Sequence, residues 1–228
     1  MLPRAMWRKE VIHYRMNKTN KEQAVIDLLK ELGTYHKFKT IYGDPPWNKH
    51  QKGKLGAIQH YDLMTLDQIK QMPIGHLAAN DALLFLWVTP GLMKEGIEVI
   101  ESWGFRYVDE MVWDKYYLGL GQRLRHTHEP LLLGVKGKPP ILCRNQASLV
   151  RAVRQDHSHK PEEFFPIIER MSEAPCLELF SRRQPTTYCR DNWSVWGNEI
   201  ESDIYIPGYP VPKYSARATL PKETEEDV

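Results

Sequence analysis

The sequence is poor in cysteine and shows no cysteine pattern. Cys143, Cys176 and Cys189 are the only cysteines among 228 residues, and no CxxC spacing occurs. Three thiols cannot all pair, which favours reduced thiols in a cytoplasmic compartment over a disulfide framework. Histidines occur at 126, 128, 157 and 159, but without cysteine or carboxylate support at a ligand spacing, so we expect no metal site.

Long apolar runs and a strong net charge are also lacking. No stretch approaches the roughly 18 apolar residues of a membrane-spanning helix, which predicts no membrane contact. Residues 1–21 hold six lysines or arginines but no apolar core, so they do not resemble a signal peptide. Because the net charge is only +2, the surface as a whole is not built to hold a polyanion.

The composition predicts one folded domain. A hydrophobic content of 42% with 11% aromatic residues argues against general disorder, and 228 residues suffice for one sizeable core. We expect a basic N-terminal extension at 1–18 and a domain at 19–200. Residues 201–228 form a tail that is first rich in proline and then acidic, and it lacks periodicity.

Apolar patterning alternates between strand and helix periods along the domain. We expect helices at 20–33, 65–72, 90–103 and 161–172, the last containing Pro166, and strands at 38–43, 82–88, 107–113, 129–136, 177–180 and 193–196. The segments at 48–59, 118–128 and 139–148 are expected to be loops, the first of them mobile. This order predicts an α/β fold with a mostly parallel sheet and helices on both faces, although the sequence has no G-x-G-x-x-G turn.

The stretch at 39–47 ends an apolar run in Asp44-Pro45-Pro46-Trp47. Neither proline can donate to a sheet, so the four residues predict a rigid corner at the carboxyl end of a strand, where ligands bind in open α/β sheets. Asp44 and the Pro45 carbonyl are acceptors suited to an exocyclic NH2 group, and Trp47 offers a face for stacking on its ring. The alternative is a proline-terminated strand followed by a core tryptophan.

This corner resembles the catalytic tetrapeptide of the adenine-N6 methyltransferase family that contains the eukaryotic mRNA adenosine methyltransferases. Further motifs stand in the order of that family: Leu84-Phe85-Leu86-Trp87-Val88-Thr89, Trp103-Gly104-Phe105, His128-Glu129, Gly134-Val135-Lys136-Gly137, Ser158-His159-Lys160-Pro161, Glu178-Leu179-Phe180 and Trp196-Gly197-Asn198-Glu199. The Arg-His-Thr-His-Glu spacing and the short chain are more similar to bacterial or phage members. The resemblance implies a three-layer, Rossmann-like methyltransferase fold.

The resemblance also implies S-adenosyl-L-methionine as cofactor, which needs no glycine-rich turn because it has no pyrophosphate. It places Lys160 at the cofactor carboxylate, and Arg182, Asn198 and Glu199 around the ribose. Asp44 is also expected to bind the cofactor. In the eukaryotic pattern, glutamine stands at the position of Glu199, and a His-Asn pair stands where this chain has Arg183 and Gln184. The alternatives are that one of Arg182 and Arg183 is only solvated, that Lys160 lies on the surface, and that Asn198 merely forms a turn.

On the substrate side, the resemblance places Tyr61 and Glu129 near the target base. A helix-edge aromatic and a strand-start carboxylate are the corresponding alternatives. Two basic clusters flank these positions, and each is either a phosphate contact or solvated surface. Their members are Lys49, Lys52 and Lys54 in the first, and Arg123 and Arg125 in the second.

These features predict a methyltransferase that acts on adenine N6 in nucleic acid, on a base that is flipped out or already accessible. DNA is favoured over RNA only by the similarity to compact prokaryotic members, since no 2′-OH reader is identifiable. The resemblance also admits a homodimer or a heterodimer with a related subunit. Two other functions stay open: a catalytically silent nucleic-acid-binding subunit, and a methyltransferase of a small amine or free nucleotide.

Overall fold

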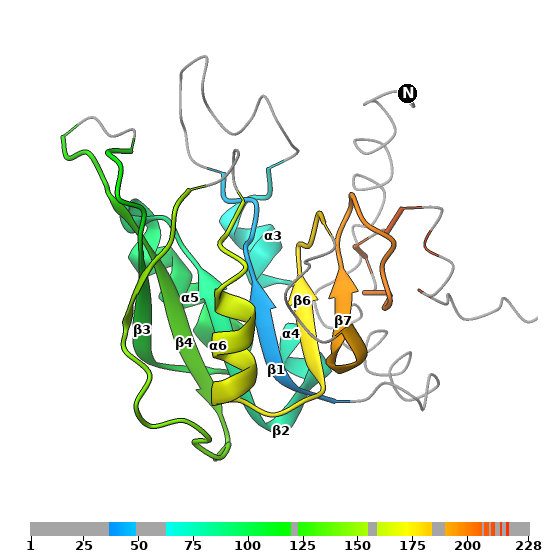
Figure 1. The fold of residues 1–228 in the computed structure, drawn as a ribbon. Coiled ribbons are helices and arrows are strands. Elements are labelled where there is room, and N and C mark those ends of the chain that lie inside the picture. Colours follow the sequence, from blue (N-terminus) through cyan, green and yellow to red (C-terminus); the bar gives the residue numbers. More distant parts are fainter. Residues whose placement is uncertain are drawn as a thin grey trace, which may run out of the picture.

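The computed structural model describes residues 37–48, 63–119, 123–154, 159–183, 190–206, 208–209, 211–212, 215 and 218 (Figure 1). The strands are β1 (Phe38–Gly43), β2 (Ala78–Trp87), β3 (Arg106–Asp114), β4 (His128–Lys136), β5 (Leu149–Arg151), β6 (Cys176–Leu179) and β7 (Trp193–Trp196). The helices are α3 (Leu66–Lys70), α4 (Ile74–Leu77), α5 (Met93–Ser102) and α6 (Phe164–Met171), with short 3-10 turns η2 (Pro90–Leu92) and η3 (Arg190–Asn192). The expected extension at 1–18, the helix at 20–33 and nearly all of the loop at 48–59 lie outside these residues.

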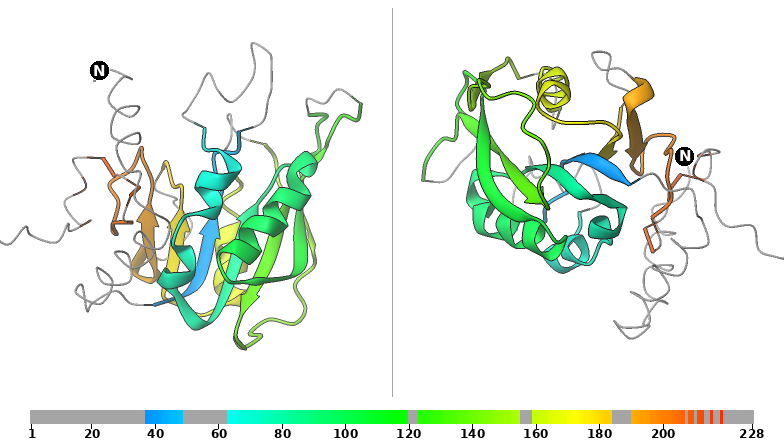
Figure 2. Two further views of the ribbon diagram at one scale, coloured as in Figure 1. Left: turned by 180° about the vertical axis from the view of Figure 1, so that it is seen from behind. Right: turned by 90° about the horizontal axis from the view of Figure 1, so that it is seen from below.

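The sheet confirms the predicted mostly parallel α/β architecture. Its strand order is β5-β3-β4-β2-β1-β6-β7, and four of its neighbour pairs are parallel. β4 runs antiparallel to both β2 and β3. Helix α6 covers one face of the sheet, while α3, α4 and α5 cover the other (Figure 2). The result is three layers, as in a Rossmann-like methyltransferase.

The reversed direction of β4 matters for the site. The carboxyl ends of β1, β2, β3 and β6 meet at one edge of the sheet because these strands are mutually parallel, and the first residues of β4 lie at that same edge. Trp113 at the end of β3 pairs with Glu129 at the start of β4. Side chains far apart in the sequence are thereby brought to one rim.

Two apolar clusters fill the space between the sheet and the two helix layers. Residues of β1 and β2 alternate between them, because successive side chains of a strand point to opposite faces. Ile41 and Leu84 belong to the cluster under α3, α4 and α5, whereas Tyr42 and Phe85 belong to the cluster under α6. Burial on both faces explains why the central strands are nearly continuous apolar runs.

The ends of several elements differ from the sequence expectation. Strand β2 begins at Ala78 rather than at 82, and neither α4 nor β5 was predicted, since one is a single turn and the other has only three residues. The helix expected at 161–172 begins at Phe164, which puts Pro166 in its first turn, where an N–H has no intrahelical acceptor. Pro166 therefore removes no helical hydrogen bond. The start of α3 agrees with the helix expected from residue 65, and Thr65 and Gln68 form a capping box there.

The chain continues to pack beyond residue 200, where a tail was expected. Ile204 is 6% exposed and Ile206 is fully buried, both in the cluster that α3 covers. The Tyr209 hydroxyl donates to the Gln68 carbonyl at 2.9 Å. These apolar residues lie in irregular chain, so no periodicity revealed them. Within the described residues, no helix has the length and apolar character needed to cross a membrane, and Cys143 and Cys176 are free thiols.

Candidate active site

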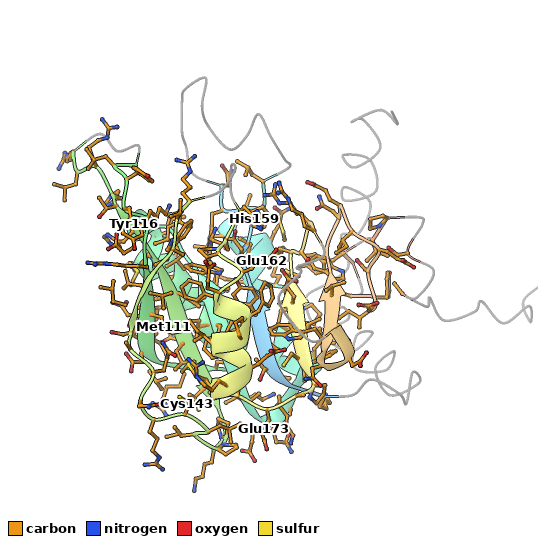
Figure 3. The ribbon with its side chains drawn as sticks, viewed as in Figure 1. Met111, Tyr116, Cys143, His159, Glu162 and Glu173 are labelled. Atoms are coloured by element: carbon orange, nitrogen blue, oxygen red, sulfur yellow. The ribbon has the colours of Figure 1, made fainter. Side chains whose placement is uncertain are left out.

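A pocket opens at the carboxyl edge of the sheet, between β1 and β6. The register of these strands pairs Tyr42 with Glu178 and Gly43 with Leu179, so that Asp44 follows directly at the rim. Helices α3 and α4, which stand between β1 and β2 in the chain, lie on one face of the sheet, whereas α6 leads into β6 over the other face. This makes the edge between β1 and β6 a topological switch point. His159 and Glu162 lie above α6 at this rim (Figure 3). The lining consists of Tyr42, Asp44, His159, Lys160, Glu162, Phe165, Glu178, Leu179, Phe180, Ser181, Arg182 and Arg183.

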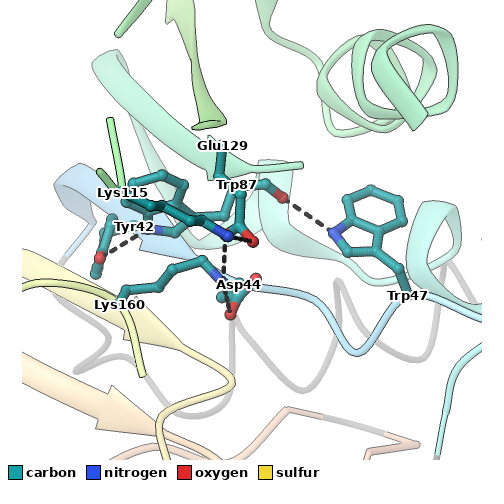
Figure 4. A network of polar contacts seen from close by, with 7 residues as sticks. All are labelled: Tyr42, Asp44, Trp47, Trp87, Lys115, Glu129 and Lys160. Atoms are coloured by element: carbon teal, nitrogen blue, oxygen red, sulfur yellow. Dashed lines mark hydrogen bonds and ion pairs between the residues drawn. The ribbon is translucent and has the colours of Figure 1, made fainter. Parts of the chain in front are cut away.

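Four charged side chains form an alternating row beside the pocket (Figure 4). Lys160 Nζ lies 2.6 Å from Asp44 Oδ2 and 3.3 Å from Glu129 Oε2. Glu129 in turn accepts from Lys115, which follows β3. The side chains of Lys160, Glu129 and Lys115 are only 16 to 18% exposed, and that of Asp44 is 32% exposed. The structure thus brings Asp44, Lys160 and Glu129 together, and it adds Lys115, which the sequence analysis did not identify.

The row fixes the charge of Lys160 and Glu129. Burial alone lowers the pKa of Lys160, but the Asp44 and Glu129 carboxylates outweigh it and raise this pKa above that of an ordinary lysine. Burial likewise disfavours the ionised form of Glu129, yet Lys160 and Lys115 hold its pKa below the usual value. The pKa of Asp44 is raised by burial, and the Lys160 ammonium opposes this shift. Lys160 therefore stays charged between the two carboxylates.

The two prolines make the corner after β1 rigid. The Pro45 carbonyl accepts from the Trp47 amide at 2.8 Å, and the Pro46 carbonyl accepts from the Met64 amide at 3.0 Å. A carbonyl has two lone pairs, so Pro45 retains acceptor capacity beside Asp44. The corner is therefore anchored to the chain that leads into α3 while it presents two acceptors at the rim.

Trp47 occupies a different place from the one predicted. Its side chain is only 8% exposed and packs in the cluster under α3 to α5. The indole Nε1 donates to the Trp87 carbonyl at 3.0 Å, and Figure 4 shows the ring on the far side of the corner from Lys160. The corner turns the chain back under the end of β2, so the ring offers no open face for a base. The expectation that Trp47 stacks on the substrate is thus replaced by a packing role.

This role makes a stability prediction. Trp47→Ala should lower the free energy of unfolding by about 3–5 kcal/mol, because it removes a buried ring and leaves the Trp87 carbonyl without its donor. Urea unfolding followed by circular dichroism measures the change. Tyr117→Ala, which truncates a 64% exposed aromatic, is the control and should change stability by less than about 0.5 kcal/mol. An unchanged urea midpoint for Trp47→Ala would contradict the packing role and favour the predicted contact of Trp47 with the substrate.

Glu178 also lines the pocket, although the sequence marks it only as part of the Glu178-Leu179-Phe180 motif. Among the described residues, its Oε2 is buried without a hydrogen-bond partner. Burial raises the pKa of Glu178 to about 8, with Asp44 and Glu162 adding to the shift and Ser181 opposing it. The sequence signal that could have identified Glu178 is a carboxyl group within the short buried strand β6. An unpaired acceptor in a pocket is suited to a ligand donor.

The raised pKa predicts how stability depends on pH. Between pH 4.5, the ordinary glutamate value, and about 8, the unfolded chain loses the Glu178 proton while the folded chain keeps it, so stability falls as pH rises. Glu178→Gln should therefore be more stable than wild type, with a gain that grows by at most about 1.4 kcal/mol per pH unit across this window. Urea unfolding of both proteins at several pH values measures the gain. Glu101→Gln, on the exposed face of α5, is the control, and a pH-independent difference for Glu178→Gln would contradict the assignment.

Arg182 reaches the pocket because two backbones meet closely. A Cβ on Gly197 would lie 1.8 Å from the Ser181 carbonyl, so only glycine fits there, and the Ser181 amide donates to the Trp196 carbonyl at 3.0 Å. Phe180 adopts φ 62°, which turns the chain from β6 into the pocket wall. Arg182 is half-buried in that wall and Arg183 is exposed.

Asn198 and Glu199, which the resemblance places at the ribose, are not among the residues that line the described pocket. Both side chains are exposed, since the chain bends away after Gly197. Their assignment to the ribose stays a prediction. Tyr61, Lys49, Lys52 and Lys54 lie outside the described residues. Arg123 and Arg125 are exposed on the connection from β3 to β4, at the same edge of the sheet as Asp44.

Comparison with known proteins agrees with this fold and rim. The MT-A70 family matches residues 38–199. The N(6)-adenosine-methyltransferase catalytic subunit METTL3 of Homo sapiens is 33% identical over 175 residues, which is 72% of this chain and 28% of that protein. The N(6)-adenosine-methyltransferase MT-A70-like protein of Drosophila melanogaster is 33% identical over 175 residues, or 72% of this chain and 27% of that protein. The type II methyltransferase M.MunI of Mycoplasma sp is 31% identical over 195 residues, which is 75% of this chain and 82% of that protein.

The fold and the rim with its Asp-Pro-Pro-Trp corner are those of a Rossmann-like methyltransferase. The chain belongs to the MT-A70 family. It spans only about a quarter to a third of the length of its eukaryotic relatives but most of the length of the Mycoplasma methyltransferase, which confirms the predicted likeness to compact bacterial members.

Proposed function

We propose that this chain transfers a methyl group from S-adenosyl-L-methionine to adenine N6 in nucleic acid, and that DNA is its substrate. The observation that carries the proposal is the position of Asp44, which lies at the rim of a pocket, beside the Pro45 carbonyl and in contact with a buried cation. The names of the relatives, N(6)-adenosine-methyltransferases among them, support the target atom. The preference for DNA rests on the similarity in length to the Mycoplasma type II methyltransferase.

The described pocket fits the amino-acid end of this cofactor. An α-carboxylate needs a cation, and Lys160 and Arg182 supply two at the pocket wall. An α-ammonium needs acceptors, and Glu178 has an oxygen without a partner among the described residues, with Asp44 and Glu162 close enough to influence its pKa. When bound, the cofactor supplies an electrophilic methyl group on a sulfonium. These residues would hold it so that this methyl faces the Asp44 rim.

Asp44 and Pro45 would orient the target amine. The lone pair of an exocyclic NH2 group is delocalised into the ring, and hydrogen bonds from its two N–H groups to Asp44 and the Pro45 carbonyl favour a pyramidal nitrogen. Asp44 Oδ2 already accepts from Lys160, which leaves Oδ1 for the amine. Since the corner is rigid, the nitrogen is held in line with little loss of entropy at the moment of transfer.

A direct assay tests the proposal. The purified protein is incubated with methyl-labelled cofactor and matched single-stranded DNA, duplex DNA and RNA of one adenine-containing sequence, and the product nucleosides are separated. We expect N6-methyladenine in DNA. Label only in RNA would overturn the choice of DNA, and label in free nucleotides alone would overturn the nucleic-acid substrate. Binding of DNA without any transfer would instead indicate a silent subunit.

The lysine cluster allows a separate prediction from the sequence. If Lys49, Lys52 and Lys54 contact phosphates, the triple alanine variant should show a flatter dependence of log affinity on log salt. The magnitude of the slope should fall by about 0.7–0.9 for each lost contact. Calorimetry should show unchanged cofactor affinity. Fluorescence anisotropy of a labelled adenine-containing oligonucleotide at several salt concentrations measures the slope. Equal slopes for variant and wild type would show that the three lysines are solvated.

A further inference from the structure

The connection from β3 to β4 carries an unusual number of exposed apolar side chains. We call its described residues, 115–119 and 123–127, the β3–β4 arm. Tyr116, Tyr117, Leu118 and Leu124 are 57%, 64%, 67% and 72% exposed. Figure 1 shows the arm projecting from the rim that carries the pocket, and Tyr116 lies at its base in Figure 3. Such a concentration on a short projecting segment marks a contact surface.

The arm is a paired backbone rather than a collapsed loop. The Lys115 amide donates to the Thr127 carbonyl at 2.8 Å, and the Gly119 amide donates to the His126 carbonyl at 2.9 Å. A Cβ on Gly119 would lie 2.5 Å from the His126 carbonyl, so the two halves approach too closely for a larger residue. Backbone hydrogen bonds thus hold the two halves of the arm together, while its large apolar side chains stay exposed.

The charge of the arm identifies the kind of partner. Arg123 and Arg125 are exposed on its returning half. The neighbouring carboxylates are already paired, Asp114 with Arg151 at 3.0 Å and Glu129 with Lys115. Among the described residues, neither arginine is paired with a carboxylate, although Arg125 Nε donates to the Gly119 carbonyl at 2.5 Å, so both positive charges are left for a partner. Aromatic faces interleaved with such charges suit a strand of bases and phosphates, in which every base has a face to stack on.

The arm is also continuous with the catalytic rim. It leaves β3 through Lys115 and returns to β4 at His128 and Glu129, and Lys115 and Glu129 belong to the charged row that ends at Asp44. Building on the nucleic-acid substrate argued above, we propose that the β3–β4 arm binds the strand next to the target adenine. Tyr117 stacks on a neighbouring base, and Arg123 and Arg125 contact its phosphates.

Single substitutions in the full chain test this docking surface. Tyr117→Ala should weaken binding of a labelled single-stranded DNA oligonucleotide roughly 5- to 150-fold, which corresponds to the ~1–3 kcal/mol of one base–aromatic contact. Tyr117→Trp, which keeps an aromatic face, should retain the affinity. Arg123→Gln and Arg125→Gln should each lower the log–log salt slope by about 0.7–0.9. Fluorescence anisotropy measures these changes, and calorimetry with the cofactor should detect none.

A matched control lies at the opposite edge of the sheet. Ile141 follows the carboxyl end of β4 and precedes Cys143, which Figure 3 shows at that edge, by two residues. It is 66% exposed, much as Tyr117 is. Ile141→Ala should leave DNA affinity unchanged. Wild-type DNA affinity in Tyr117→Ala would overturn the docking surface while the methyltransferase assignment stands, whereas absence of methyl transfer to any nucleic acid by wild type would overturn that assignment instead. A change from dimer to monomer in Tyr117→Ala, with DNA affinity intact, would assign the arm to a second copy of the chain and would also reject the proposal.

Discussion

Asp44→Asn should reduce methyl transfer by roughly 100- to 1,000-fold or more, the typical cost of losing one preorganised group that stabilises a transition state. The asparagine keeps the shape of the side chain but loses its charge, and it can present an NH2 where the target amine needs an acceptor. The protein should stay folded, because Lys160 retains Glu129 as a partner at 3.3 Å and Asp44 is already 32% exposed. Single-turnover transfer to an adenine-containing DNA oligonucleotide measures the loss.

Asp109→Asn provides the control for this experiment. It makes the same chemical change at an exposed carboxylate within β3, away from the rim, and should leave transfer unaffected. Thermal unfolding of both variants separates loss of the acceptor from loss of the fold. Turnover by a folded Asp44→Asn within a few fold of wild type would reject the role of Asp44 as the acceptor that orients the amine.

The sequence was sufficient to predict the central part of the fold. The runs at 38–43 and 82–88 became β1 and most of β2, which are buried on both faces, and the proline corner ended β1 as expected. Short elements escaped prediction because three or four residues cannot establish a period. The strand order, with β4 between β2 and β3, depends on tertiary packing and has no local pattern.

The candidate site was predicted only where a motif marked it. Asp44, Lys160 and Glu129 came from three separate motifs, and the strand order brings them within one hydrogen-bonded row. Lys115 has no such motif, since its role arises from the pairing of β3 with the reversed β4. Trp47 was misplaced because a sequence shows an aromatic residue after a corner but not which way the corner turns.

The motif at 196–199 also has a structural role. Trp196 and Gly197 are held against the chain after β6, where the close approach to Ser181 shapes the pocket wall. The next two residues, which the resemblance placed at the ribose, turn out to solvent. One motif can therefore contain both residues that pack and residues that are predicted to bind a ligand, and the structure is needed to tell them apart.

Lys160→Ala should raise the dissociation constant of the cofactor about 10- to 150-fold, because one hydrogen bond between charged groups contributes ~1.5–3 kcal/mol. Loss of the cation should also shift the acid limb of the pH–rate profile upward. Lys160 opposes the burial that raises the pKa of Asp44, so without it Asp44 needs a higher pH to ionise. Calorimetry with the cofactor and initial rates across pH measure the two effects.

Two further variants separate these effects from general damage. Lys160→Arg keeps the charge and should leave the acid limb near its wild-type position, even if the larger head group weakens the cofactor. Lys70→Ala removes a partly buried lysine of α3 that pairs with Glu98 of α5 at 3.1 Å. It should change neither the cofactor affinity nor the acid limb. A folded Lys160→Ala with wild-type cofactor affinity would mean that Lys160 serves only to pair Asp44 with Glu129. An upward shift of the acid limb in that same variant would still identify Asp44 as the group that must be ionised for transfer.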